Sequence, residues 1–501
     1  MPGCRDGVES RNVKENEMSH DQQRTTTVVS GAFPSYVLPG TELVETVRNP
    51  NDPTSLRFLR WQNGIVTLLP SIEHAGTLYV PPDPMQALHS QVILPDGVRP
   101  CREPAALIAG VVDTLAKFIE ADRKLLVLLA SVILCSWFCD CFEAAPYVWI
   151  VGPLGSAKTK LLKLLSCMCR RALLIGDVRS GSLYTLTDSY NPTLLVDELD
   201  LDDRNSADTL RLLRTGTVAG VPAVRNGKLF STYGLKIIAS RDVLRDAALL
   251  SRCVIVSMLP TENETEPLDE VAMRQIAQQF QPEMLMFRFT NYSRVKSFQL
   301  PSSALHDFTP RMKQVALALV ASVRGDTESE AIVLSALRER DAAAKIERAL
   351  EPEWLTEENL FRLIHEGPVH SILVGGIAAS INLKFRGEDF RVSARKVGSV
   401  LKSLGLKTET LGSLGRGLLF APAMNRQIHA VARHLGISRR TIATSRGIEN
   451  GYGGRPCLLC EELDLTDGLR FDDPSTPMPA PAKPNRPGII PSPRTEDGEQ
   501  R

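Results

Sequence analysis

A chain of 501 residues is longer than one domain ordinarily extends, so about two to four domains are expected. Hydrophobic residues make up 43% and charged residues 23%, which excludes a fibrous or largely disordered chain. The 58 basic and 58 acidic residues cancel, so no overall field favours nucleic acid or membranes, and any basic surface has to be local.

The first hundred residues divide into a polar segment and a β-rich segment. Residues 1–30 have no apolar core, so we expect them to be disordered and not to act as a secretory signal. Residues 31–100 contain the short apolar runs SLRFLRW, GIVTLLP and TLYVPP, interrupted by Pro and Gly. They predict a small β-rich N-terminal domain.

Residues 101–262 are expected to begin with two helices, Ala105–Glu120 and Arg123–Cys141. The second contains LLVLLASVILCSWFC, an uncharged run of 15 residues that is shorter than the roughly 20 needed to cross a bilayer. We therefore predict a buried helix. Ten cysteines without a secretion signal indicate a reducing compartment, and the predicted location is cytoplasmic.

Strands and helices then alternate from residue 146 to residue 260. The predicted strands are Tyr147–Val151, Ala172–Ile175, Thr193–Val196, Leu235–Ala239 and Cys253–Met258. The predicted helices are Lys158–Arg171, Ser182–Asp188 and Asn205–Arg214. Because strands this uniformly apolar are buried on both faces, the expected fold class is α/β, with a parallel sheet and helices on both of its faces.

The segment YVWIVGPLGSAKTK places a turn-rich loop between a predicted strand and a predicted helix. This loop follows the phosphate-binding pattern G-x-x-x-x-G-K-[ST], except that Ala157 stands at the second glycine position. Backbone N–H groups at the helix start are expected to bind ATP phosphates, Lys158 to reach the terminal phosphates and the Thr159 hydroxyl to ligate Mg²⁺. The predicted nucleotide-binding residues are Gly152, Pro153, Leu154, Gly155, Ser156, Ala157, Lys158 and Thr159.

The effect of Ala157 depends on its backbone conformation. A positive φ costs about 1–2 kcal/mol because of the Cβ atom, whereas a negative φ in the first helical turn makes alanine harmless. Each charge-assisted contact to a triphosphate contributes about 1.5–3 kcal/mol. One methyl group is therefore expected to weaken the site rather than abolish it.

Three further elements follow the loop. In NPTLLVDELD, Asp197 ends an apolar strand and is predicted to hold Mg²⁺, while Glu198 is predicted to orient or deprotonate the attacking water; an acidic surface turn is the alternative. Ser240 ends the strand in GLKIIASRD, where it could contact the γ-phosphate or the water. Arg252 in LLSRCVIVSM is predicted to act across a subunit boundary on the transferring phosphate, the alternative being a surface salt bridge.

These four elements resemble, in their order, the ATPase core of AAA+ proteins. The likeness is greatest to the superfamily 3 helicases and to the primase-associated helicase-like ATPases of plasmids and prophages. It covers residues 105–260 well and extends loosely to residue 440. The resemblance implies that Gly152–Thr159 is the first motif, Asp197 and Glu198 the second, Ser240 the sensor and Arg252 the finger.

The same resemblance implies a P-loop ATPase that uses ATP and Mg²⁺, forms a ring-shaped homo-oligomer and acts on DNA as a helicase or translocase of a replication module or mobile element. A primase or replication initiator is a candidate partner. The sequence departs from the pattern at Ala157 and at Ser240, where asparagine is usual, so a slow ATPase is an alternative.

After a mostly helical segment at residues 263–352, which is predicted to be a lid or linker, the chain becomes basic. Residues 384–446 contain 13 Lys or Arg and 3 Asp or Glu, a net charge of +10 that predicts phosphate contact. Residues 353–446 are predicted to form a winged helix. Its amphipathic helix is Ser393–Leu404, with Arg395 and Lys396 toward the duplex, and Arg416 lies on its hairpin. A solvated basic face, or a surface for an acidic protein, is the alternative.

A second DNA-binding candidate is the helix-turn-helix pattern of Ile428–Ala443, in which Arg439 and Arg440 would begin the recognition helix. Residues 447–501 comprise a Cys457–Cys460 pair and, from Phe471, a proline-rich tail predicted to be disordered. Because structural zinc takes four ligands, free thiols are the first expectation for the two cysteines, with His429, His434 or a partner chain as alternative sources of ligands.

The leading functional hypothesis from the sequence is an ATP-driven motor on DNA. A nucleotide-switched DNA-binding regulator with little turnover is the second, and a structural DNA binder with an inactive ATPase fold is the third.

Overall fold

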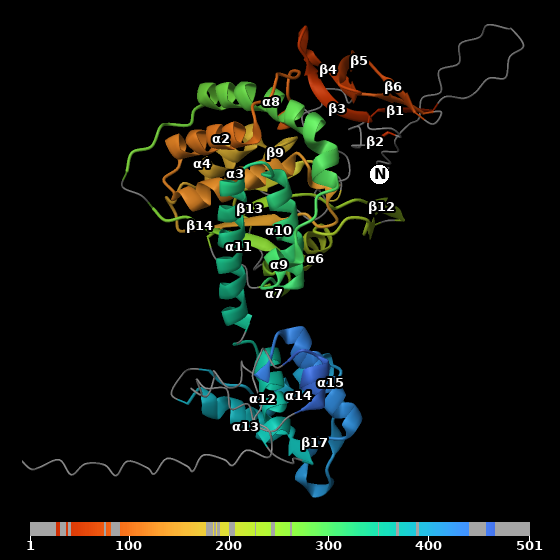
Figure 1. The fold of residues 1–501 in the computed structure, drawn as a ribbon, viewed down its shortest axis with the longest axis vertical. Coiled ribbons are helices and arrows are strands. Elements are labelled where there is room, and N and C mark those ends of the chain that lie inside the picture. Colours follow the sequence, from red (N-terminus) through yellow and green to blue (C-terminus); the bar gives the residue numbers. More distant parts are fainter. Residues whose placement is uncertain are drawn as a thin grey trace, which may run out of the picture. The chain divides into compact units, whose positions relative to one another are not determined.

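The computed structural model divides the chain into two compact units, Met1–Ala344 and Lys345–Arg501 (Figure 1). It describes residues 27–30, 37–38, 42–74, 77–81, 91–176, 184, 187, 191–199, 206–225, 227–241, 246–260, 263–348, 350–366, 370–386, 390–439 and 457–465. Most of the predicted helix Ser182–Asp188, residues 1–26, the tail from Phe471 and Arg440 lie outside these ranges. Residues 27–30, predicted to be disordered, form a strand instead, because they pair with residues 77–80. The finer domain boundaries given above remain predictions.

A five-stranded sheet forms the centre of the first unit, and all of its neighbouring strands are parallel. Its strand order is β14 (Cys253–Ser257), β8 (Tyr147–Val151), β13 (Lys236–Ser240), β10 (Thr193–Val196) and β9 (Ala172–Ile175). The predicted α/β class with a parallel sheet is confirmed.

Helices cover both faces of this sheet because successive side chains of each strand point to opposite sides. Val148 and Ile150 join the core that contains helix α4 (Lys158–Met168), together with α2 (Pro104–Phe118) and α3 (Arg123–Ser136). On the other face, Trp149 lies in a core with α6 (Ser206–Thr215) and α7 (Ala247–Leu250). Residues of one short strand thus serve two separate cores.

Helix α3 contains the first twelve residues of the uncharged run, and its residues from Leu126 to Ser136 are all buried. The Asp122 carboxylate accepts a hydrogen bond from the Leu125 N–H at 2.7 Å and begins the helix. The helix ends at Ser136, five residues before the predicted end, and a 3₁₀ turn, η1 (Cys139–Cys141), follows. Among the described helices, none combines the length and the apolar character that a membrane crossing requires.

Helix α8 (Glu270–Lys296) lies in the segment that was predicted to be mostly helical, and it contains a proline, Pro282, in its interior. The helix continues through Pro282, whose carbonyl oxygen accepts a hydrogen bond from the Arg99 N–H at 3.2 Å. Buried Phe280, Met284 and Phe287 lie on both sides of the proline. Their burial offsets a proline cost of about 3 kcal/mol in a helix interior.

The β-rich N-terminal residues form two small sheets within the first unit. One has the order β2 (Val37–Leu38), β3 (Glu42–Asn49), β4 (Asp52–Gln62) and β5 (Ile65–Leu69), and the other β1 (Thr27–Ser30), β7 (Thr77–Val80) and β6 (Ile72–His74). Leu43 and Val47 of β3 belong to the same core as α3 and α8. The sheet is therefore attached to the region of the parallel sheet by shared apolar packing.

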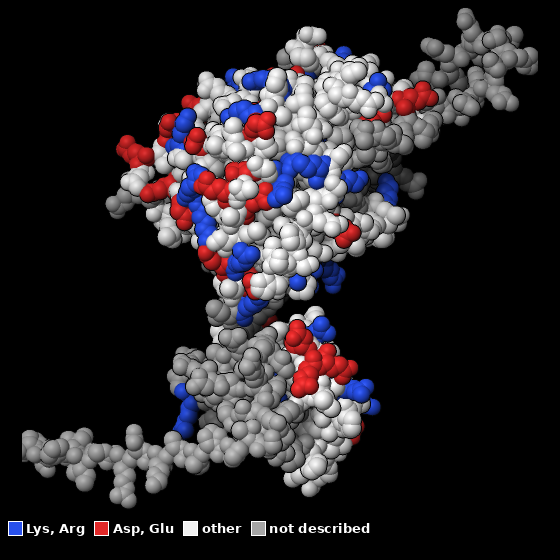
Figure 2. All heavy atoms as spheres, viewed as in Figure 1, with Lys and Arg blue, Asp and Glu red and all other residues white. Residues whose placement is uncertain are grey.

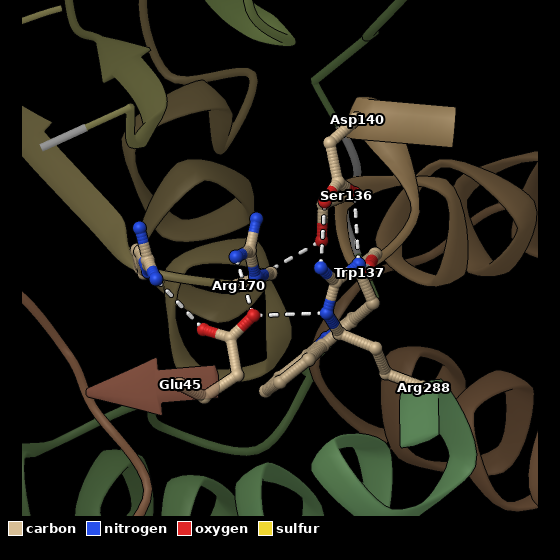
Figure 3. A network of polar contacts seen from close by, with 7 residues as sticks. Glu45, Ser136, Trp137, Asp140, Arg170 and Arg288 are labelled. Atoms are coloured by element: carbon tan, nitrogen blue, oxygen red, sulfur yellow. Dashed lines mark hydrogen bonds and ion pairs between the residues drawn. The ribbon is translucent and has the colours of Figure 1, made fainter. Parts of the chain in front are cut away.

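A buried ionic network adds to this attachment (Figure 3). The carboxylate of Glu45 on β3 accepts hydrogen bonds from Arg170 at 2.5 Å, from Arg171 at 2.9 Å and from Arg288 of α8 at 2.9 Å. Arg288 also donates to both carboxylate oxygens of Asp140, at 2.8 and 2.7 Å. Burial opposes the charge on Glu45, but the three guanidinium groups outweigh it and lower the pKa of this carboxyl. Glu45 is therefore ionised in the folded protein.

The described part of the first unit also contains a hairpin and further helices, the last of which extends four residues past Ala344. The hairpin, β11 (Ala223–Arg225) and β12 (Lys228–Phe230), lies between α6 and β13 and was not predicted. The helices are α9 (Ser302–Leu305), α10 (Pro310–Ser322) and α11 (Thr327–Arg348), and α10 packs on α3.

The second unit places helices around a small antiparallel sheet. Its helices are α12 (Pro352–Glu366), α13 (Val374–Lys384), α14 (Ala394–Ser403), α15 (Pro422–Leu435) and α17 (Leu458–Glu462). Its sheet has the order β15 (Ser371–Leu373), β17 (Arg416–Leu419) and β16 (Glu409–Thr410), with the short turn η2 (Gly412–Leu414) between the last two in sequence. One apolar core joins all five helices.

Candidate nucleotide site

The loop between β8 and α4 is built on close backbone contacts. At Gly152 an added Cβ atom would lie 2.2 Å from the Met258 carbonyl oxygen and 2.5 Å from the Ser156 hydroxyl oxygen. Only glycine fits there without a backbone shift, because the chain that leaves β14 passes directly over the loop. Gly155 has φ +79°, which glycine adopts without strain. Both glycines of the loop are thus required by its shape.

Ala157 stands immediately before α4 with φ 59° and ψ 21°, in the left-handed region. Of the two conformations considered for this residue, the structure shows the costly one. The Cβ atom therefore adds about 1–2 kcal/mol of strain. The loop keeps the backbone geometry that glycine would give it at this position.

Two side chains at the start of α4 turn toward the loop and toward β10. The Lys158 ammonium group donates to the carbonyl oxygens of Gly152 at 2.5 Å and of Pro153 at 2.9 Å, so it lies across the loop. The Thr159 hydroxyl donates to Oδ2 of Asp197 at 2.7 Å. A hydroxyl and a carboxylate from residues 38 positions apart thus meet beside the loop.

Glu198 follows Asp197 and also has a left-handed backbone, with φ 60°. Its carboxylate forms an ion pair with Arg241 at 2.6 Å, and the two side chains are 62% and 56% exposed. Strained non-glycine residues of this kind concentrate at functional sites. No motif in the sequence points to Arg241. The signal that could have indicated its place in the site is its position directly after an apolar strand, which pairs with β10.

Ser240 has a different environment from the predicted one. Its hydroxyl oxygen accepts a hydrogen bond from the Trp149 indole N–H at 2.8 Å, and the residue is 8% exposed. Trp149 belongs to the core on the sheet face opposite α4. Of the two consecutive residues, the structure therefore brings Arg241, and not Ser240, to the Glu198 carboxylate.

Arg252 lies at the opposite edge of the sheet from the loop. Cys253, which follows it, pairs with Tyr147 at the start of β8, whereas the loop follows Val151 at the end of that strand. Five residues of extended strand span about 16 Å. The half-buried Arg252 donates to the Ala248 carbonyl oxygen at a short distance, and burial, followed by nearby Arg311, lowers its pKa. Within one chain, Arg252 is thus remote from the loop.

The residues predicted to contact DNA have three different positions. Arg395 and Lys396 on α14 and Arg416 at the start of β17 are exposed. Arg439 is only 1% exposed and lies beside Cys460, so it is an interior residue rather than part of a DNA-facing surface. Arg440 lies outside the described residues. On the face of the first unit seen in Figure 2, charges of both signs are interspersed.

Comparison with known protein families finds no match, and no curated protein matches the chain. Among solved structures, the A-form apo structure of the NrS-1 C-terminal region is similar with TM-score 0.33 and 13% identity, over 75% of this chain and 97% of that chain. A full-length MCM homologue from Methanopyrus kandleri is similar with TM-score 0.34 and 11% identity, over 60% and 77%. Likeness of this degree carries no argument about function, which has to come from the site.

Proposed function

We propose that this protein is a P-loop ATPase that acts as a motor on DNA. The observation that carries the proposal is the 2.7 Å contact between the Thr159 hydroxyl and the Asp197 carboxylate beside the loop. A hydroxyl and a carboxylate oxygen at this separation fit the hard, oxygen-preferring Mg²⁺ ion. When Mg²⁺ is bound there with ATP, it neutralises charge on the β- and γ-phosphates.

The protein's own groups then have separate tasks. Backbone N–H groups from Gly155 to Thr159 bind phosphate oxygens, and Lys158 leaves the carbonyl groups of its loop for the terminal phosphates. Glu198 accepts a proton from water as the water oxygen bonds to the γ-phosphorus and the bond to the β,γ-bridging oxygen breaks. ADP and phosphate are the products.

The ion pair of Glu198 with Arg241 adds a condition to this mechanism. The guanidinium group of Arg241 contacts the Glu198 carboxylate oxygen, so Arg241 has to move away before that oxygen can contact the attacking water and take its proton. This pair, together with the strained Ala157, favours a second candidate, a nucleotide-switched DNA-binding regulator with little turnover. In that case, replacing Arg241 by alanine should raise the rate of ATP hydrolysis.

The proposed role of Arg252 requires a homo-oligomer, with a ring as the expected form. This residue lies at the sheet edge opposite the loop, so it could reach a γ-phosphate only in the site of a neighbouring subunit. An arginine supplied in this way stabilises transition-state charge and contributes about 10³–10⁵ in rate in systems that use it. Turnover is then expected to rise steeply with protein concentration.

DNA contact is assigned to the second unit and to the β11–β12 hairpin. The order helix, strand, helix, helix, strand, strand from α12 to β17 supports a winged helix, with α14 as its recognition helix and the turn before Arg416 as its wing. Exposed Arg395 and Lys396 would bind the phosphate backbone. The hairpin adds exposed Arg225 and Lys228 from the first unit. A primase or replication initiator remains the proposed partner class, and the cytoplasm the proposed location.

ATP hydrolysis measured with and without single-stranded DNA tests the proposal. Lys158→Ala should lose nucleotide binding, and Glu198→Gln should keep binding but lose turnover. Lys160→Ala is the matched control, because Lys160 lies on the same helix but donates to Thr265 Oγ1 at 2.7 Å, away from the loop. The proposal fails if the wild-type protein releases no more phosphate than the Lys158 variant.

Two further outcomes separate the alternatives. A single burst of hydrolysis, combined with ATP-dependent DNA affinity, would identify the regulator rather than the motor. Equal melting temperatures with and without Mg²⁺-ATP would indicate a structural DNA binder with an inactive fold, since a ligand that binds the native state raises its stability.

A further inference from the structure

We propose that the second unit contains a structural zinc site formed by His365, His429, Cys457 and Cys460. The four candidate ligand atoms, two imidazole nitrogens and two sulfurs, all lie within 4.8 Å of one another. Two sulfurs and two nitrogens in a compact group are a zinc-binding set. The inference does not depend on ATP hydrolysis or on DNA binding.

The four residues come from three separate helices of the unit. His365 lies on α12 and His429 on α15, while Cys457 precedes α17 and Cys460 lies within it. The Cys457 sulfur is 3.3 Å from Nε2 of His429, and the Cys460 sulfur is 3.2 Å from Nε2 of His365. Zinc bonds are about 2.3 Å to sulfur and 2.0–2.1 Å to nitrogen, so a sulfur and a nitrogen bound to the same tetrahedral zinc lie about 3.6 Å from each other. The ligands are therefore close to their bound positions.

Both histidines are oriented as metal ligands usually are. Nδ1 of His365 is 2.5 Å from the Phe361 carbonyl oxygen, and Nδ1 of His429 is 2.7 Å from the Asn425 carbonyl oxygen. A proton at Nδ1 donates to that carbonyl and leaves the lone pair on Nε2, the atom that faces the sulfurs. Such a carbonyl partner is the common outer contact of metal-binding histidines.

The surroundings of the cluster are largely apolar and packed. His429 is 2% exposed and Cys460 is fully buried. The centroid of the Phe361 ring lies 4.4 Å from that of the His365 ring and 5.2 Å from that of the His429 ring. The partly buried Cys457 leaves a route for a metal ion.

Zinc at this position would connect the C-terminal segment 457–465 to the first helix of the unit. Cys460 and Leu465 belong to the apolar core of the unit, yet α17 is only five residues long and buries little by itself. A metal that binds only the folded arrangement adds its binding free energy to folding. The role inferred for the ion is therefore to hold α12, α15 and α17 together.

Metal analysis of the purified, reduced full-length chain tests this inference. About one zinc per chain is expected, as for a single four-ligand site. His429→Ala should lose it, and cobalt in place of zinc should give the visible absorption of tetrahedral thiolate coordination. His434→Ala is the matched control: His434 is exposed on the same helix and outside the cluster, so its loss should leave the zinc content unchanged.

A second variant separates ligand loss from unfolding. His365→Cys replaces one zinc ligand by another, so it should retain the metal, whereas His365→Ala should lose it. Three results would overturn the proposal: no uptake of zinc by the reduced chain in competition with a chromogenic chelator, equal zinc in wild type and His429→Ala, or a Cys457–Cys460 disulfide in freshly purified protein.

Discussion

Replacement of Ala157 by glycine should stabilise the first unit, although it removes a methyl group. The residue has φ 59°, where a Cβ atom costs about 1–2 kcal/mol. Glycine itself lowers the stability by about 0.5–1 kcal/mol relative to alanine, because a glycine residue loses more conformational freedom on folding. The expected net gain is therefore about 0–1.5 kcal/mol, centred near 0.75 kcal/mol, or about three- to fourfold in the folding equilibrium.

Tryptophan fluorescence during urea unfolding can measure this change in one unit alone. Of the four tryptophans, Trp61, Trp137 and Trp149 lie in the first unit and Trp354 in the second. In a Trp354→Phe background, the signal reports the unit that contains the loop. Nucleotide titration of the same variants then shows whether the loop keeps its binding shape; Ala157→Gly should bind ATP at least as well as wild type.

Ala157→Val should lower the stability of the first unit, the opposite of the change expected for Ala157→Gly. A β-branched side chain tolerates positive φ least, so valine should be less stable than alanine by more than the gain from glycine. The expected order is Gly, then Ala, then Val. If valine were as stable as alanine, or glycine clearly less stable, residue 157 would not hold a left-handed backbone in solution and the strain argument would be wrong.

Three other predictions follow from buried or crowded positions. Gly152→Ala should lower the free energy of unfolding by about 1–3 kcal/mol and weaken ATP binding, because the new Cβ atom would lie 2.2 Å from the Met258 carbonyl oxygen. Urea unfolding and nucleotide titration would measure the two effects, and an unchanged ATP affinity would contradict the crowding. Glu45→Gln should cost about 3–5 kcal/mol, because it removes a buried negative charge that contacts three guanidinium groups. Folding lowers the pKa of Glu45, so its contribution to the free energy of unfolding is present above the unfolded pKa of 4.5 and is lost as pH falls. The wild type should therefore lose more stability than the Gln variant between about pH 5 and pH 3, the range of carboxyl titration. Equal acid sensitivity of the two proteins would refute this. Burial raises the pKa of Glu357 to about 8, and neither of its carboxylate oxygens has a hydrogen-bond partner among the described residues, so the stability of the second unit should fall from pH 4.5 to about pH 8. Glu357→Gln should remove that slope in Trp354 fluorescence, and a slope that persists would assign it to another group.

Much of the central sheet and the loop is predictable from local sequence. An apolar strand of about five residues, a loop with glycines and a lysine, and a helix form one contiguous stretch, so their order needs no distant contact. Asp197 was assigned to the loop because it ends a second apolar strand, and parallel neighbouring strands bring their carboxyl ends to one edge of the sheet. The α/β class and the candidate nucleotide residues both followed from such segments.

Other features depend on which residues meet across the fold. Whether Ala157 is strained is a matter of φ, which the residue type leaves open, and Ser240 faces away from α4 because side chains alternate along a strand. The sequence pattern predicts Arg439 on a surface, whereas the structure places it inside, beside Cys460 of helix α17. The residue pattern within one segment does not predict which distant residues these side chains contact.

The metal cluster shows the distinction most clearly. The sequence by itself showed two cysteines at a spacing that suits two zinc ligands and placed His429 and His434 as equal candidates near them. Only packing in three dimensions decided between them, because α15 turns His429 inward and His434 outward and α12 brings His365 to the same sulfurs. Local chemistry is thus determined by residue type and spacing, whereas a site made from three helices exists only once a shared apolar core has set their positions.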